Sequence, residues 1–286
     1  MFHVKPMKDF NNFYCTAKDR LVTGELYSIY FNKDKTLGKT KINHDEEMYR
    51  FYKSEEYNSH QSKPKIFSDR LYFFARRIMI LFKYSIIKFK INKGKVLDYG
   101  CGNGDFLKYI SKKKIGVVGV EKSLSSQKIC KSKGLEVYSS LKNSPKQMYN
   151  IITLWHVLEH MSNPSKSIDE FAKILSNNGA IVIAAPNIQS LDSQYFKEEW
   201  AALDIPRHLW HFTPKGLINL LLKKHFVLQK KRPLYLDAYY ISLLSARRKK
   251  MLFPWTVAFL IGTLSNIIGL YTGNYSSSIF VFEKKS

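Results

Sequence analysis

The chain has 286 residues, of which 45% are hydrophobic, enough for one large domain or for a domain with an N-terminal extension. Its 46 basic and 23 acidic residues give a net charge of +23, but the excess is spread along the chain and does not single out a nucleic-acid interface. Three scattered cysteines exclude a disulfide framework, and the N-terminal residues lack the apolar core of a signal peptide, so we expect a reducing, cytoplasmic setting.

The N-terminal part of the chain predicts little regular structure before one long helix. Residues 1–65 are polar and weakly periodic, and we expect an irregular extension with one short helix near 46–53. Residues 68–91 then show a basic amphipathic pattern, with apolar side chains at helical spacing: Leu71, Phe74, Ile78, Leu81 and Phe82.

Short apolar runs alternate with helical patterns from Lys95 onward. The runs cover 95–99, 116–121, 135–139, 150–155 and 180–186, and the helical patterns cover 105–113, 124–133 and 166–175. This alternation predicts βαβ units with right-handed crossovers. The fold class is therefore α/β, with a doubly wound, Rossmann-like sheet in a domain that spans residues 66–286.

Two inserts interrupt the last third of this domain. An irregular insert, 187–214, precedes a helix at 214–224, and an apolar helical insert, 235–272, lies between a final strand pair at 226–232 and 277–283. Residues 252–271 are long and apolar enough to span a bilayer. If residues 277–283 rejoin the sheet, a single crossing would place that strand on the wrong side of the bilayer. We therefore expect a buried or surface-lying helix pair and leave peripheral membrane contact open.

A glycine-rich loop carries the strongest chemical signal. Gly100, Gly102 and Gly104 stand between a strand-like run and a helix. Glycines let the backbone approach a ligand closely, and a helix start adds unpaired N–H donors. Glu121 ends the next strand-like run, at the spacing where a carboxylate binds ribose hydroxyls in dinucleotide folds.

Two details favour S-adenosylmethionine over a dinucleotide as the ligand of this loop. The dinucleotide fingerprint G-x-G-x-x-G requires glycine or alanine at position 105, where this chain has aspartate. Asp98 lies two residues before the first glycine, where it would repel a pyrophosphate and pair with an ammonium group. A ribose together with a cationic amine matches S-adenosylmethionine better than NAD.

In its motifs the chain resembles class I S-adenosylmethionine-dependent methyltransferases of the ubiquinone-biosynthesis-like group. The matching segments are VLDYGCGNGDF (96–106), GVEKS (119–123), ITLWHVLEHMSNP (152–164) and GAIVIAAPN (179–187). The resemblance covers about residues 60–286. It implies the strand order 3-2-1-4-5-7-6, with the last strand antiparallel.

The same resemblance implies roles for individual residues. The glycine loop, with Cys101, would enclose the methionine end of the cofactor, Asp98 would lie near its amino group, and Glu121 would bind its ribose. Trp155 and His156 would lie beside the cofactor and the substrate entrance. Some relatives carry a zinc-ribbon-like N-terminus rich in cysteine; because residues 1–65 keep only Cys15, they correspond to a degenerate form of it, and we expect no zinc there.

The pattern His156-Val-Leu-Glu159-His160 also matches the H-x-x-E-H motif of some zinc peptidases. Two histidines at this spacing on a helix could share a metal, with the glutamate as general base. The motif follows directly on a strand of the cofactor-binding sheet, so we expect no metal site.

The stretch DIPRHLWHF, 204–212, supplies candidates on the acceptor side of the pocket. We prefer His208 over His211 as the catalytic candidate in this stretch. His156 and Arg207 are the other catalytic candidates. A structural role is the alternative for each: either histidine could pin the 187–214 insert to the sheet, and Arg207 could pair with Asp204.

The sequence favours methyl transfer to a small-molecule, lipid-like or glycan-linked acceptor, with O-, N- and C-methylation left open. A second hypothesis is a non-catalytic methyltransferase-fold protein that binds a partner or a membrane surface through 68–91 and 252–271. A nucleic-acid methyltransferase is disfavoured, since no added RNA-binding module and no asparagine–proline–aromatic tetrapeptide is recognisable.

Overall fold

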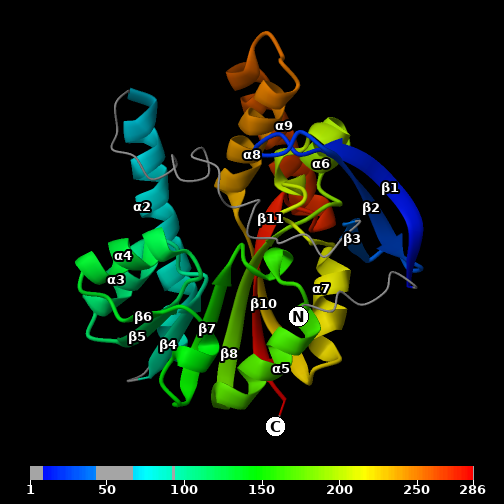
Figure 1. Ribbon diagram of the computed structural model, residues 1–286. Helices are drawn as coiled ribbons and strands as arrows, with labels where there is room; N and C mark the ends of the chain where they lie inside the picture. Colours follow the sequence, from blue (N-terminus) through cyan, green and yellow to red (C-terminus); the bar gives the residue numbers. More distant parts are fainter. Residues whose placement is uncertain (1–8, 43–66, 92–93, 286) are drawn as a thin grey trace.

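The computed structural model describes residues 9–42, 67–91 and 94–285. A seven-stranded sheet forms the centre of the protein, in the order β10-β11-β8-β7-β4-β5-β6 (Figure 1). Its strands are β4 (Lys95–Tyr99), β5 (Gly116–Val120), β6 (Val137–Tyr138), β7 (Tyr149–Trp155), β8 (Leu175–Pro186), β10 (Phe226–Pro233) and β11 (Ser277–Lys284).

The order of the strands confirms the predicted doubly wound fold. Strands β4 to β8 pair in parallel, whereas β11 runs antiparallel between β8 and β10. Taken in chain order as strands 1 to 7, this is the expected arrangement 3-2-1-4-5-7-6. The carboxyl ends of the parallel strands therefore meet at one edge, where ligands bind in open α/β sheets.

The helices of the domain follow the predicted alternation. They are α2 (Phe67–Ile87), α3 (Asp105–Ser111), α4 (Leu124–Ser132), α5 (Pro164–Ile174) and α7 (Pro214–Leu222). Asn163 caps α5 and Thr213 caps α7 through their side chains, and each helix begins with proline, which suits the first turn. Apolar side chains of α5 and α7 pack against the sheet and form much of the core, among them Ile168, Phe171, Leu217 and Leu221.

A second sheet corrects the expectation of an irregular N-terminal extension. Strands β1 (Phe10–Lys18), β2 (Leu26–Asn32) and β3 (Leu37–Lys41) pair antiparallel, and β9 (Trp210–Phe212) joins them from the 187–214 insert. Along β2 the buried side chains Tyr27, Ile29 and Phe31 alternate with more exposed ones, which is the period-two pattern of a strand. The short helix expected near 46–53 lies outside the described residues.

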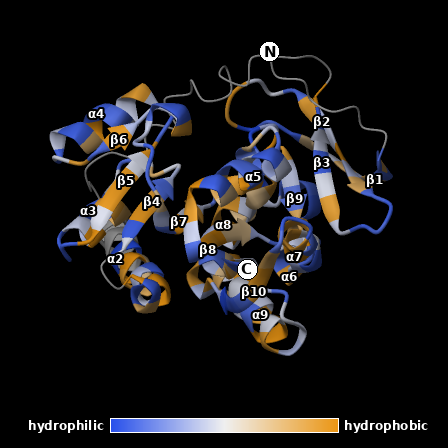
Figure 2. Ribbon diagram, turned by 90° about the horizontal axis from the view of Figure 1, so that it is seen from below, coloured by the Kyte–Doolittle hydropathy of each residue, from blue (hydrophilic) through white to orange (hydrophobic). Residues whose placement is uncertain are grey.

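The 187–214 insert contains more regular structure than its sequence predicts. It includes α6 (Leu191–Phe196) and two 3₁₀ turns, Lys197–Glu199 and Ala201–Leu203, before β9. Figure 2 shows the second sheet and the β6 edge of the main sheet on opposite sides of the molecule. The insert thus connects the large sheet to the N-terminal strands.

The apolar insert forms a helical hairpin, α8 (Tyr235–Arg248) and α9 (Pro254–Thr272). Its small residues allow close packing: a Cβ added at Gly262 would lie 2.7 Å from Cδ1 of Tyr239, and one at Gly269 would lie 2.5 Å from Cδ1 of Tyr275. The predicted helix pair is therefore present, and β11 returns to the sheet after it (Figure 1).

Candidate cofactor and acceptor site

The glycine loop lies at the carboxyl end of β4 and has one open position. Gly100, Gly102 and Gly104 all have left-handed backbones, with φ of 74°, 54° and 74°. A Cβ at Gly100 would lie 2.5 Å from Cγ2 of Val157, and one at Gly104 would lie 2.8 Å from Sγ of Cys130. At Gly102 it would meet nothing within 4 Å. The loop is packed at both ends and leaves space for a ligand at its centre.

Glu121 lies against this loop at the end of β5. Its Oε2 accepts a hydrogen bond of 2.9 Å from the Gly102 N–H, and its Oε1 accepts one of 2.8 Å from the Ser123 N–H. Ser123 in turn caps α4. An ionised carboxylate has about four acceptor positions, so further hydrogen bonds can be accepted. The predicted pairing of the glycine loop with Glu121 is present in the fold.

Asp98 is buried beneath the loop, in register with Thr153 of β7. Its Oδ1 accepts a hydrogen bond of 2.7 Å from the Thr153 hydroxyl. Burial raises the pKa of Asp98 to about 7, although the Thr153 hydrogen bond and the Lys83 charge both favour its ionised form. A cationic ligand group would favour the ionised form further.

Lys83 of α2 is a neighbour of this site that the sequence did not single out. Its Nζ lies 4.7 Å from the centre of the Trp155 ring, a cation–π contact. Burial lowers the pKa of Lys83, while the charges of Asp98 and Asp237 oppose that shift. The Trp155 ring packs edge-on against Phe106 at 5.1 Å. Lys83 reaches the cofactor side because α2 packs near the carboxyl ends of the strands, a contact that the sequence pattern does not show.

Cys101 lies within the loop, but its thiol faces the protein. A Cβ added at Gly119 would lie 2.8 Å from its Sγ, which places the sulfur against β5. The backbone of Cys101 is also engaged: its N–H donates to the Val120 carbonyl at 3.2 Å, and its carbonyl accepts from the Gly104 N–H at 3.0 Å. Its position therefore favours a role in shaping the loop.

His156 follows β7 with an unusual left-handed backbone, φ 56°. Its Nε2 lies 3.2 Å from Oδ2 of Asp237, and its Nδ1 lies 3.5 Å from Oε1 of Glu159. Burial lowers the pKa of His156, but the hydrogen bonds and charges of the two carboxylates outweigh burial and raise it to about 9. The side chain is 34% exposed, so a charged imidazolium lies at the surface of the site.

Asp237 is the second residue that the sequence did not single out. It lies in the first turn of α8, after β10, and meets His156 only because the apolar insert folds back over the ends of the strands. No sequence motif connects the two positions.

Arg207 does not occupy the acceptor-facing position that was expected. Its side chain is 1% exposed, and its guanidinium lies 2.8 Å from Asp204 and 3.2 Å from Asp19 of the N-terminal strands. The structural alternative, a pair with Asp204, is present. Arg207 thus joins the insert to the second sheet.

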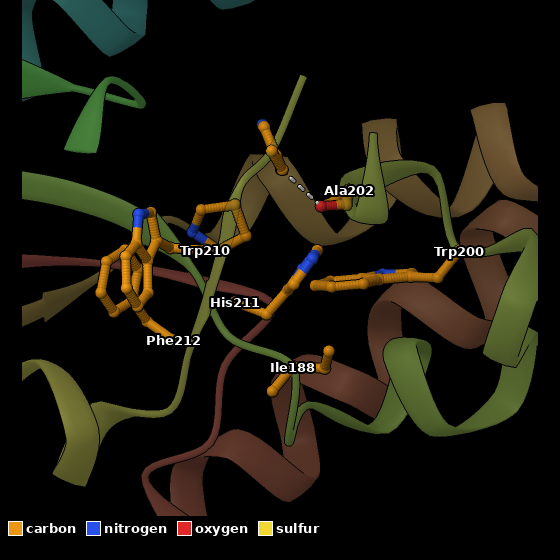
Figure 3. A pocket seen from close by; sticks show the side chains of 8 residues that line it. Ile188, Trp200, Ala202, Trp210, His211 and Phe212 are labelled. Atoms are coloured by element: carbon orange, nitrogen blue, oxygen red, sulfur yellow. Dashed lines mark hydrogen bonds between the residues drawn. The ribbon is translucent and has the colours of Figure 1, made fainter. Parts of the chain in front are cut away.

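The two histidines of the same stretch are also buried and bonded to the protein. Nδ1 of His208 donates to the Ala202 carbonyl at 2.8 Å, and Nε2 of His211 lies 2.9 Å from the Thr40 hydroxyl. Burial lowers their pKa values to about 4 and about 3. Figure 3 shows His211 beside Trp200 and Ile188 in a small pocket. These positions favour the pinning role over the expected catalytic one.

The H-x-x-E-H segment is not a continuous helix. His156 precedes a 3₁₀ turn at Leu158–His160, so the two histidines do not lie on successive turns as in the zinc peptidases. Glu159, His160 and His208 do converge, with one ligand atom of each within 4.8 Å of the others. The expected absence of a metal therefore stays a prediction.

Comparison with known proteins gives one family. A model described as "Methyltransferase domain" matches residues 66–230, more than half of the chain. An uncharacterized protein of Methanocaldococcus jannaschii is 28% identical over 152 residues, which are 51% of this chain and 72% of that protein.

Solved structures share the fold at low sequence identity. An S-adenosylmethionine-dependent methyltransferase from Thermotoga maritima is 15% identical, with a TM-score of 0.50, over 76% of this chain and 95% of its own. The StiE O-MT is 13% identical, with a TM-score of 0.53, over 77% of this chain and 78% of its own. At such identities the likeness concerns the fold alone.

Proposed function

Because the chain belongs to the methyltransferase-domain family, we propose that it transfers a methyl group from S-adenosylmethionine to a small-molecule or lipid-like acceptor. The observation that carries this proposal is the open position at Gly102, with Asp98 beneath the loop and Glu121 beside it. When bound, the sulfonium cofactor supplies an already activated methyl group, so the protein need not generate an electrophile.

Each part of the loop suits one part of this cofactor. The backbone around Gly102 borders the methionine end, the ionised carboxylate of Asp98 pairs with the ammonium group, and Glu121 accepts hydrogen bonds from the ribose hydroxyls. The positive charge of the ligand compensates the burial of Asp98, which has no ion pair of its own within hydrogen-bonding distance among the described contacts.

His156 and Asp237 form the acceptor side. At neutral pH the imidazolium of His156 directs one N–H to Asp237 and the other to Glu159, so its role is to hold Asp237 in place and to supply positive charge beside the acceptor rather than to remove a proton. The side chain of Asp237 is partly exposed, and it accepts the proton that is released as the acceptor–methyl bond forms. Orientation of the acceptor in line with the methyl group and exclusion of water supply the remainder of the rate.

Calorimetric titration of the purified protein tests the cofactor. We expect heat of binding with S-adenosylmethionine and none with NAD, and binding of NAD alone would overturn the proposal. Incubation with methyl-labelled S-adenosylmethionine and fractionated lipid and small-molecule extracts then identifies the acceptor. In that assay His156→Gln should raise KM more than it lowers kcat below pH 9, since it removes the charge that binds the acceptor while it keeps a donor.

A further inference from the structure

Helix α9 buries its small residues and exposes its large apolar ones, which is the reverse of a surface helix in a soluble protein. The buried face consists of small residues, namely Ala258, Gly262, Ser265 and Gly269. The exposed face carries large apolar ones, among them Phe259, Leu260, Leu264, Ile267 and Leu270. A surface helix normally exposes polar side chains, whereas helices in lipid pack through small residues and expose large apolar ones.

The apolar surface continues around the tip of the hairpin. Leu252 is 84% exposed and Phe253 is 66% exposed, and Trp255 lies exposed on the first turn of α9. Three exposed basic residues, Arg247, Lys249 and Lys250, shortly precede them, and the guanidinium of Arg247 lies 5.3 Å from the centre of the Trp255 ring. Basic side chains next to an exposed tryptophan and aliphatic residues are typical of segments that bind the membrane interface.

The charge of the hairpin selects the kind of surface that can cover it. Between Asp237 and Glu283 the sequence contains four basic residues and no acidic one. A negatively charged surface is complementary to this hairpin, and anionic lipid headgroups above hydrocarbon offer the charge and the apolar phase together.

The position of α9 within the fold decides between crossing a bilayer and lying on it. Among the described helices, Pro254–Thr272 alone is long and apolar enough to cross a membrane, with 28% of its apolar window buried. However, β11 begins shortly after it and pairs with β8, while the Ser265 hydroxyl donates to buried Asp192 of α6 at 2.7 Å. Both ends and the inner face of α9 are held by the same domain.

From these observations we propose that the α8–α9 hairpin docks on the surface of an anionic bilayer, with the outer face of α9 and the tip at 252–255 in the interface. In Figure 1 the hairpin rises from the edge where the parallel strands end, the edge that also carries the glycine loop. Asp237, which lies in the first turn of α8, and His156 are at its base. The docking surface itself does not depend on catalysis.

Vesicle sedimentation tests the proposal with the full chain. We expect the protein to bind vesicles of phosphatidylglycerol and phosphatidylcholine at least tenfold more strongly than pure phosphatidylcholine vesicles, and to be released by alkaline carbonate. If the protein sedimented with neither kind of vesicle, the proposal would be overturned. A carbonate-resistant membrane pool would overturn the surface-lying arrangement.

One substitution separates docking from folding. Phe253 is the N-cap residue of α9 and makes no side-chain cap, so Phe253→Asp introduces a residue favoured at this position and should preserve the helix. We expect it to weaken vesicle binding at least tenfold while S-adenosylmethionine affinity stays unchanged. The control Leu26→Asp changes an equally exposed leucine on β2 and should leave vesicle binding intact. If Phe253→Asp instead dissociated a dimer and the wild type did not bind vesicles, self-association would replace the membrane as the occupant.

Discussion

The glycine loop and the 187–214 insert are stabilised by contacts of different range. In the loop, Glu121 bonds to Gly102 and Ser123, which lie close to it in sequence or on the adjacent element. In the insert, Arg207 bonds to Asp19 and His211 to Thr40, residues from the far N-terminal strands. The glycine loop thus depends on local backbone geometry and the insert on contacts across the chain. Substitutions in the two regions should therefore affect different properties.

The largest expected effect is on the stability of the insert. Arg207→Met removes the cation between Asp19 and Asp204 and leaves a buried carboxylate without its counter-charge. We expect the free energy of unfolding in urea to fall by about 3–5 kcal/mol. Cofactor affinity, measured by calorimetry under conditions where the variant is folded, should change little. Arg20→Met, which removes the more exposed pair with Glu199, should cost no more than ~1 kcal/mol. Equal losses in the two variants would refute the structural role of Arg207.

The next effect concerns the affinity of the loop for its cofactor. Glu121→Ala removes the carboxylate proposed to bind the ribose, and hydrogen bonds to charged groups contribute about 1.5–3 kcal/mol. We therefore expect binding of S-adenosylmethionine to weaken roughly 10- to 100-fold in calorimetry. The exposed Glu136 serves as the control, since Glu136→Ala should bind normally. Unchanged affinity in Glu121→Ala would remove the ribose role from this residue.

A pH series sharpens the role of Asp98. Its pKa of about 7 in the free protein lies above the ordinary value of 3.8, so the carboxyl is largely protonated below pH 7 and ionised above it. Because the ammonium form of the ligand binds the ionised carboxylate, affinity should rise from pH 6 to pH 7 as Asp98 ionises. It should fall again at higher pH, where the ligand's α-amino group, with an ordinary pKa of about 7.7–8.0, loses its proton. Asp98→Asn should bind weakly with no such rise. A slope that persists in this variant would point to another titrating group.

The smallest effect comes from a matched pair of glycines. Gly102 and Gly134 both have left-handed backbones, with no atom within 4 Å of an added Cβ. Substitution by alanine should cost each about 1 kcal/mol of stability because of backbone strain alone. Only Gly102→Ala should also weaken cofactor binding, since its Cβ would enter the space assigned to the ligand. Parallel thermal unfolding and calorimetry compare the two, and equal affinities would place the ligand elsewhere.

The sequence was sufficient for the main sheet and for the cofactor side. Strands such as β4 and β7 are buried on both faces and read as continuous apolar runs, and left-handed glycines between strand and helix mark the loop. The pairing of the glycine loop with Glu121 was predicted from their separation in the sequence, because both belong to one βαβ unit. In these regions each local signal agrees with the tertiary structure.

The second sheet and the roles of the insert residues could not be predicted in the same way. β3 pairs with β9 across most of the chain, and neither strand is long or apolar enough to be recognised alone. Arg207, His208 and His211 are reactive residue types whose roles depend on burial, and the sequence does not show that Asp19, Ala202 and Thr40 hold them. Lys83 and Asp237 reach the site only through the packing of α2 and α8.

The pairing of β9 with β3 also determines how this protein can be recombined. Thr40 donates to the His208 carbonyl at 2.7 Å, and the Thr36 carbonyl accepts from the Thr213 hydroxyl at 2.8 Å, so residues 168 and 177 positions apart in the sequence complete one small sheet. A chimera that exchanged the 187–214 insert alone would contain β9 without its partner strand β3, and Arg207 would keep Asp204 but lose Asp19. We therefore expect the insert to fold in a related protein only when the N-terminal strands are grafted together with it.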